Sequence, residues 1–126
     1  MQFDELYELA KSVINPRRIS KCAEAGEVGA AILTKSGNVY TGVCIDTGCG
    51  MGFCAEHAAA AAMITAGESH VLKVIAVGCN GGIIPPCGRC REFISQLHEE
   101  NLKAEVMVKK GVIVTIQELL PYDWRR

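Results

Sequence analysis

The chain has 126 residues, a formal net charge of −1 and a hydrophobic content of 49%. This length suffices for one domain with a single apolar core, and we expect that domain to span residues 1–126. The near-neutral charge argues against the basic surface that nucleic-acid-binding proteins need. No apolar run is long enough, and free enough of charge and glycine, to cross a membrane. We therefore expect neither nucleic acid nor a membrane as a partner.

Seven cysteines are present, an odd number that does not fit a complete set of disulfides. Residues 1–5 carry acids and lack the order of basic and then apolar residues that marks a secretory signal. Without such a signal, closely spaced cysteines indicate metal binding in a reducing compartment sooner than a disulfide framework. We expect a cytoplasmic protein in which some cysteines bind a metal.

Hydrophobic periodicity and turn residues predict an alternation of helices and strands. The expected order is helix 3–15, loop 16–26, strand 28–34, strand 39–45, loop 46–52, helix 54–66, strand 72–77, helix 87–101, strand 104–108, strand 112–114, and a short helix from 115 that Pro121 ends. The middle of this order favours right-handed crossovers, with helices on both faces of one mixed five-stranded sheet. The class is therefore α/β.

Two short motifs place cysteines at the starts of two expected helices. They read Cys54-Ala55-Glu56-His57 and Pro86-Cys87-Gly88-Arg89-Cys90-Arg91. Three thiolates there can hold one zinc ion and leave its fourth position for water, as catalytic zinc sites do. We predict one Zn²⁺ per chain, bound by Cys54, Cys87 and Cys90. Cys22 or His57 as a further ligand is the less favoured alternative.

Glu56 follows the first cysteine by two positions and is expected to face the zinc-bound water without binding the metal. Zinc deaminases of nucleobases use this spacing, with the carboxylate as general acid and base. Deamination of a 4-aminopyrimidine needs a proton moved from water to the ring and then to the leaving amine, which one carboxylate can do in turn. The simpler reading, an acid favoured in the first turn of a helix, leaves the flanking cysteines unexplained.

Three thiolates outweigh the two positive charges of the ion, which weakens zinc as a Lewis acid. The partial positive charge of helix N-termini favours thiolates and offsets this. We expect hydrogen bonds from His57, Arg89 and Arg91 to the sulfurs to help in the same way. Both arginines have a simpler interpretation as solvated residues of a first helical turn.

These motifs resemble those of the small, homotetrameric cytidine deaminases, in the same order along nearly the whole chain. The other matching segments are Val28-Gly29-Ala30-Ala31, Thr41-Gly42-Val43 and Glu118-Leu119-Leu120-Pro121. The resemblance implies a three-layer α/β/α fold, one catalytic zinc per subunit, and active sites completed by neighbouring subunits. It also places Ala55 and the carbonyl of Pro85 beside the substrate.

The residues expected around the base and the sugar depart from that family. Gly26 stands where an aromatic residue usually packs on the base, and Cys44-Ile45-Asp46 replaces an Asn-x-Glu pair that holds the ribose hydroxyls. Asp46 can still accept a hydroxyl hydrogen bond, whereas Cys44 is a poor donor and acceptor. These departures, and Trp124 near the C-terminus, resemble the related blasticidin S deaminases. We expect Trp124 either to cover the substrate or to seal a subunit interface.

The prediction is a zinc hydrolase that deaminates a cytosine nucleoside, cytidine or deoxycytidine. Its first alternative keeps the reaction and changes the substrate to a modified nucleoside such as blasticidin S. A noncatalytic zinc module is disfavoured because Glu56 accompanies an incomplete ligand set. An editor of nucleic acid is disfavoured by the charge and by the minimal length.

Overall fold

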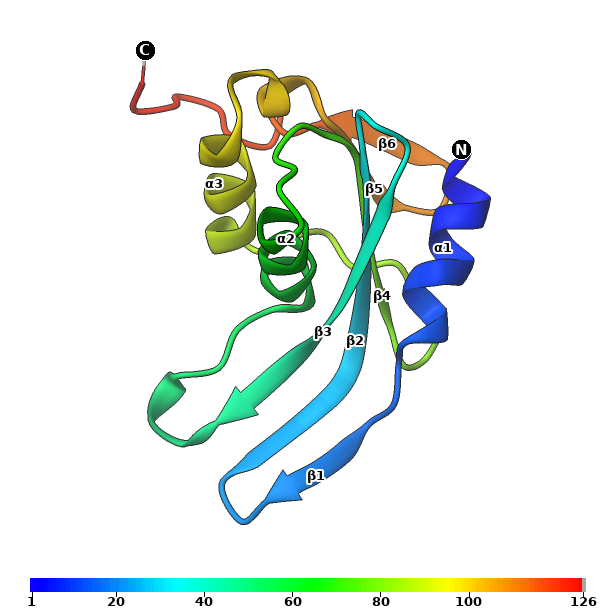
Figure 1. Ribbon diagram of the computed structural model, residues 1–126, viewed down its shortest axis with the longest axis vertical. Coiled ribbons are helices and arrows are strands. Elements are labelled where there is room, and N and C mark those ends of the chain that lie inside the picture. Colours follow the sequence, from blue (N-terminus) through cyan, green and yellow to red (C-terminus); the bar gives the residue numbers. More distant parts are fainter. Residues whose placement is uncertain (126) are drawn as a thin grey trace.

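The computed structural model describes residues 1–125 (Figure 1). In chain order the elements are α1 (Phe3–Ser12), β1 (Arg17–Ser20), β2 (Ala23–Thr34), β3 (Val39–Thr47), η1 (Gly48–Gly50), α2 (Ala55–Thr65), β4 (Val71–Gly78), α3 (Gly88–Leu97), η2 (Glu99–Lys103), β5 (Glu105–Lys109) and β6 (Val112–Thr115). Among the helices in this part of the chain, none has the length and apolar character to span a membrane.

The fold has the three layers that the family resemblance implies. α1 covers one face of the sheet, and α2 and α3 lie side by side on the other (Figure 1). The strands follow the order β1-β2-β4-β5-β6, with β3 paired to β2 as well. β4 and β5 pair in parallel and the other pairs are antiparallel, so the sheet is mixed as predicted.

The sheet has six strands, whereas five were predicted. The additional strand, β1, lies in the segment predicted as loop, since its residues show no apolar alternation. All four of them are exposed in the structure. It pairs with an outer part of β2 that begins at Ala23, five residues before the predicted start. Gly26, with φ +91°, lies where the pairing of β2 with β3 shifts register. Such an irregularity bends a strand, and the outer ends of β1, β2 and β3 extend past the helices (Figure 1).

Two other boundaries differ from the prediction. α3 ends at Leu97 and a separate 3₁₀ helix, η2, follows, where one helix to residue 101 was expected. The short helix predicted from Thr115 is absent from the described residues, although its capping box forms through Thr115 and Glu118. Turns follow instead, because Pro121 comes too soon for a helix to continue.

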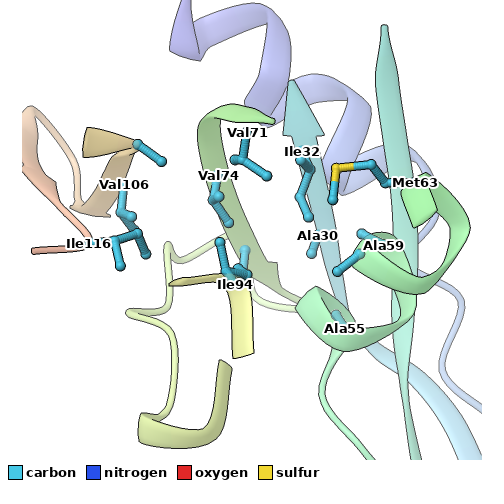
Figure 2. Close-up of a cluster of buried hydrophobic side chains, with 13 residues drawn as sticks. Ala30, Ile32, Ala55, Ala59, Met63, Val71, Val74, Ile94, Val106 and Ile116 are labelled. Carbon is cyan, nitrogen blue, oxygen red and sulfur yellow. The ribbon is translucent and has the colours of Figure 1, made fainter. Parts of the chain in front are cut away.

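Two apolar cores fill the spaces between the layers. Alternate side chains of β2 enter different cores: Ala30 and Ile32 face α2 and α3, and Ala31 and Leu33 face α1. Figure 2 shows the first core, in which side chains of α2, α3 and the sheet point toward one another. This alternation is what a strand buried on both faces requires.

The course of β3 and β4 determines where the two cysteine motifs lie. Both strands are antiparallel to β2, so they run in the same direction and end at the same edge of the sheet. Each is followed by the helix that carries a cysteine motif, α2 after β3 and α3 after β4. Both helices therefore begin at that edge, next to the extended ends of β2 and β3 (Figure 1).

Gly42 lets α2 lie unusually close to β3. A Cβ atom at Gly42 would collide with the backbone nitrogen of Ala59 and would lie 2.8 Å from the carbonyl oxygen of Ala55. The small alanines of α2 allow the same close approach from the helix side. Gly42 thus fixes the depth at which α2, and with it Cys54, sits against the sheet.

We predict that Gly42→Ala lowers the free energy of unfolding by about 1–3 kcal/mol, as overpacking of a well-packed core does. The reason is that the colliding atoms belong to the helix backbone, so the whole helix must move. Gly48→Ala is the matched control, because nothing lies within 4 Å of its added Cβ, and it should change stability by no more than about 0.5 kcal/mol. Equal effects in denaturant titrations at one protein concentration would contradict the close approach.

Candidate metal centre

Three cysteines from two helix starts meet at one point. The Sγ atoms of Cys54 and Cys87 are 3.4 Å apart, and those of Cys87 and Cys90 are 3.5 Å apart. All three sulfurs lie within 4.8 Å of one another. They are the three cysteines that the sequence predicted as metal ligands.

The local backbone presents these sulfurs at the helix ends. Cys54 and Cys87 are the N-cap residues of α2 and α3, each in an extended conformation. Cys90 lies in the first turn of α3 and is buried. All three thiols therefore stand next to free backbone N–H groups and the positive ends of two helix dipoles, which favour thiolates.

The spacing fits a zinc ion. With Zn–S bonds of about 2.3 Å in a tetrahedron, two sulfurs lie about 3.8 Å apart, close to the separations of Cys87 from its two neighbours. The three thiols leave one tetrahedral position for a further ligand. In residues 1–125 no other group of three or more potential ligands comes this close together.

Burial makes two of the three thiols, those of Cys54 and Cys90, costly to ionise without a cation. It raises the pKa of Cys54 to about 11, with a further increase from the Cys87 thiol, and it also raises the pKa of Cys90. Burial acts in the same direction on Cys87, but hydrogen bonds from the Cys90 backbone amide and from the neighbouring thiols outweigh it and lower that pKa. A bound metal deprotonates such thiols outright, so the group is built for a cation.

Glu56, the predicted proton carrier, is buried in the first turn of α2, with 4% of its surface exposed. Burial raises the pKa of its carboxyl above the ordinary value. The carboxyl is near enough to Cys54 and Cys90 to act on their pKa values electrostatically. A buried carboxyl beside the sulfurs has the environment in which enzymes keep general acids and bases.

His57 contacts the sulfur group directly. Its Nδ1 lies 3.4 Å from the Sγ of Cys90, and its ring stacks on Phe93 with 4.1 Å between centroids. An N–H group here can donate to a thiolate. The sequence carries no signal for this stacking, because His57 and Phe93 lie far apart in the chain.

Arg89 and Arg91 were expected to donate hydrogen bonds to the cysteine sulfurs, but their side chains donate elsewhere. Arg89 donates over 3.5 Å to the carbonyl oxygen of Gly52, and Arg91 donates over 2.7 Å to that of Pro86. In residues 1–125 the hydrogen bonds of both side chains go to backbone carbonyls. Both arginines therefore connect segments of backbone around the metal centre.

The residues predicted to touch the substrate lie on the metal side of the sheet or at its helix starts. Gly42 faces α2 and Cys44 packs against the same core, so by strand alternation Asp46 also faces this side. Asp46 is exposed and Cys44 is half-buried. Ala55 is buried as the first residue of α2, and Pro85 is exposed in the loop before α3.

The glycine at position 26 has a structural cause. Its φ of +91° and the collision that a Cβ would make with the carbonyl of Asn15 leave no room for a side chain. The aromatic residue expected there from the family resemblance is therefore incompatible with this backbone. Phe53, which is 36% exposed, directly precedes Cys54, and its ring lies 6.5 Å from the ring of His57 between centroids.

The side chain of Trp124 packs against α3, on a side of that helix that faces away from the three sulfurs. Its Nε1 donates to the carboxylate of Glu92 over 3.3 Å, and 71% of its surface is exposed. Glu92 follows Cys90 by two positions, about 200° around the helix. The indole thus sits on the face of α3 opposite the buried thiol.

The other cysteines do not join the metal group. Cys22, Cys49 and Cys79 are exposed and Cys44 is half-buried, all as free thiols. Cys22 lies in the turn between β1 and β2. The alternative of Cys22 as a fourth ligand has no support in this arrangement.

Comparison with known proteins agrees with the geometry. The sequence pattern described as "Cytidine and deoxycytidylate deaminase zinc-binding region" matches residues 3–106. A cytidine deaminase of Halalkalibacterium halodurans is 34% identical over 98 residues, which cover 75% of this chain and 74% of that protein. A blasticidin-S deaminase of Bacillus cereus is 32% identical over 108 residues, covering 79% and 77%.

Among solved structures, the crystal structure of cytidine deaminase from Mycobacterium leprae superposes with a TM-score of 0.80 at 27% identity, covering 96% of this chain and 98% of that one. The family resemblance and the zinc cofactor predicted from the motifs are thus confirmed. The chain belongs to the cytidine and deoxycytidylate deaminase family with its zinc-binding region.

Proposed function

We propose that this protein is a zinc-dependent hydrolase that converts the 4-amino group of cytidine or deoxycytidine to the oxygen of the uracil form. The observation that carries the proposal is the group of three thiols at two helix starts with a buried carboxyl, Glu56, beside it. In the reaction, the C4–N bond breaks and a C4–O bond forms with water. One hydrogen of that water ends on the ring nitrogen N3 and the other on the released ammonia.

In this proposal Cys54, Cys87 and Cys90 hold the zinc and Glu56 moves the protons. A zinc ion bound there would supply a water whose pKa is lowered to about 7. Glu56 takes one proton from that water and gives it to N3, and it then takes the remaining hydroxyl proton and gives it to the leaving amine. The raised pKa of its buried carboxyl supports this role, because a proton carrier must both take and release a proton.

His57 is proposed to donate a hydrogen bond from Nδ1 to the thiolate of Cys90. The stacking of its ring on Phe93 holds the imidazole in that orientation. A donor here withdraws charge from the sulfur and so strengthens the metal as a Lewis acid. Groups of this kind around a ligand typically change metal affinity or activity by about 10–100-fold.

The substrate is proposed to lie between the metal centre and the extended end of β3. Asp46 is assigned to a sugar hydroxyl, with Cys44, Ala55 and the carbonyl of Pro85 as the neighbouring contacts. Their common placement on the metal side of the sheet supports this assignment. Phe53 is the aromatic surface available to the base in place of a residue at position 26.

A modified cytosine nucleoside such as blasticidin S is the second candidate substrate. It is favoured by the relative named blasticidin-S deaminase and by the loss of two contacts that cytidine would use. Asp46, exposed on the metal side, offers a carboxylate to a cationic substituent. The reaction at the base is the same for both candidates.

We also propose that residues 1–126 form one domain, that the protein is a cytoplasmic homotetramer, and that it serves pyrimidine salvage. The outer face of α2 supports the assembly, because Ala61, Ala62 and Ile64 are exposed there on a helix with no charge after His57. Ala59 and Ala60, by contrast, belong to the core. Trp124, turned away from its own metal centre, suits a contact with a neighbouring subunit.

The direct test of the proposed function is a panel of cytidine, deoxycytidine, deoxycytidylate, cytosine and blasticidin S, followed by loss of the cytosine chromophore. We expect detectable turnover of cytidine and deoxycytidine. It should be about ten- to a thousandfold less efficient than in a relative that has both the aromatic residue at position 26 and the Asn-x-Glu pair. This range counts as fully lost a base stack worth about 1–3 kcal/mol and one hydrogen bond worth about 0.5–1.5 kcal/mol. Stacking of the base on Phe53 would place turnover at the more efficient end of the range. Asp46→Ala should reduce turnover further. If only blasticidin S reacts, the second candidate replaces the first, and if none reacts, the proposed function is wrong.

Glu56→Gln should keep the fold and the zinc yet lose turnover by at least about 10²–10⁴-fold, the contribution of a positioned acid and base. Zinc content and steady-state kinetics on the best substrate of the panel check this together. Glu99→Gln, which changes an exposed acid in η2, is the matched control and should keep full activity. An active Glu56→Gln variant would rule out the proton-carrier role.

Cys87→Ala should lose most of the zinc, because two thiols remain where three are needed. Elemental analysis after dialysis against a zinc buffer should give about one zinc per chain for the native protein. Cys79→Ala removes an exposed thiol outside the group and should keep its zinc. Full zinc and normal activity in Cys87→Ala would show that the ligand set is wrong.

Sedimentation equilibrium should show four chains per particle at micromolar concentration. Ala61→Arg places a charge on the outer face of α2 and should dissociate the particle. Ser36→Arg, at an exposed turn between β2 and β3, should not. A native monomer with full activity would contradict active sites shared between subunits.

A further inference from the structure

Arg91 connects three parts of the chain that meet behind the metal centre. It lies in the first turn of α3, next to Cys90, and its side chain is half-buried. Its Nε donates to the carbonyl oxygen of Pro86 over 2.7 Å, and its Nη1 donates to that of Leu119 over 3.3 Å. One guanidinium thus joins the loop before α3, the helix itself and the C-terminal turns.

The carbonyl of Pro86 belongs to the peptide bond that leads directly into Cys87. Because a peptide unit is planar, fixing this carbonyl also fixes the orientation of the peptide plane that ends at the Cα of Cys87. Pro86 is buried, and its ring restricts the backbone further. The position of the Cys87 sulfur therefore depends on where this carbonyl is held.

The second acceptor is anchored in the core. Leu119 packs against the core on the α2 and α3 side of the sheet. The turn that presents its carbonyl is closed by Thr115 and Glu118, whose side chains each accept from the other's backbone N–H, at 3.0 and 3.1 Å. This gives the Glu118-Leu119-Leu120-Pro121 segment, which contains no group of the metal centre, a physical connection to that centre.

We propose that Arg91 is a positioning residue that braces the Pro86–Cys87 peptide against the turn at Leu119. In this way it holds the Cys87 thiol at the spacing a metal requires. A guanidinium suits the task because its donors lie in a rigid plane and reach two acceptors at once. The inference rests on the proposed ligand role of Cys87 and adds a residue that touches neither metal nor substrate.

The test compares Arg91→Met, Arg91→Lys and the control Arg17→Met in competition for zinc with a chromophoric chelator. Arg91→Met keeps the apolar stem and removes both hydrogen bonds, and we expect it to bind zinc about 10–100-fold more weakly. Arg91→Lys keeps the charge and can serve one carbonyl at a time, so it should fall in between. Arg17 is exposed on β1 and donates to the carbonyl of Asn15, and its variant should bind zinc like the native protein.

Cobalt(II) in place of zinc distinguishes positioning from simple loss of stability. At a temperature where all variants are folded by circular dichroism, Arg91→Met should show weakened or shifted thiolate-to-cobalt and visible bands, because the Cys87 sulfur is displaced. Unchanged bands and unchanged zinc affinity would overturn the proposal. If Arg91→Met does not fold, Arg91→Lys decides by the same two measurements.

A double-mutant cycle tests the connection to the C-terminal turn. Glu118→Ala opens that turn and should weaken zinc binding in the native background but have no further effect in Arg91→Met. If Glu118→Ala weakens zinc binding equally in both backgrounds, the turn does not act through Arg91. The outcome of these metal measurements does not depend on the substrate panel. The positioning role of Arg91 can therefore be wrong while the proposed function holds.

Discussion

The common direction of β3 and β4 is the constraint on which the metal centre depends. Two strands that flank β2 and run antiparallel to it must end at one edge of the sheet. The helices that follow them then begin next to one another, which brings Cys54 within 3.4 Å of Cys87 although 33 positions separate them in the chain. The close packing of α2 at Gly42 sets how deep the first of these helix starts lies.

The electrostatics of the centre follow from this meeting of helix starts. The thiols of Cys54 and Cys90 resist ionisation because they are partly or fully buried. A cation and two helix dipoles supply the positive charge that their thiolates require. Around them, His57 faces a sulfur, whereas Arg89 and Arg91 hold backbone carbonyls. Of the polar side chains nearest the sulfurs, one therefore contacts a sulfur and the other two contact the backbone that leads to the cysteines.

Much of this arrangement could be predicted because it has local signals. Cysteine spacing identified all three thiols. The helix propensity of the alanine run located α2, apolar periodicity located α3, and Gly42 stood in a motif of the family resemblance. Features without a local signal were missed. β1 has four exposed residues, the stacking of His57 on Phe93 joins distant segments, and the acceptors of Arg91 are carbonyls, which every residue has.

One departure from the family resemblance, the glycine at position 26, also has a physical cause that a sequence alone does not display. Gly26 is required by a left-handed φ and by the nearby carbonyl of Asn15. The missing aromatic residue is thus a consequence of how β2 bends.

We propose that three thiols hold one zinc and leave a position open for water. X-ray absorption at the zinc edge of the substrate-free protein tests this coordination. We expect three sulfurs at about 2.3 Å and one oxygen at about 2.0 Å. Four sulfurs, or two sulfurs with two nitrogens, would contradict it.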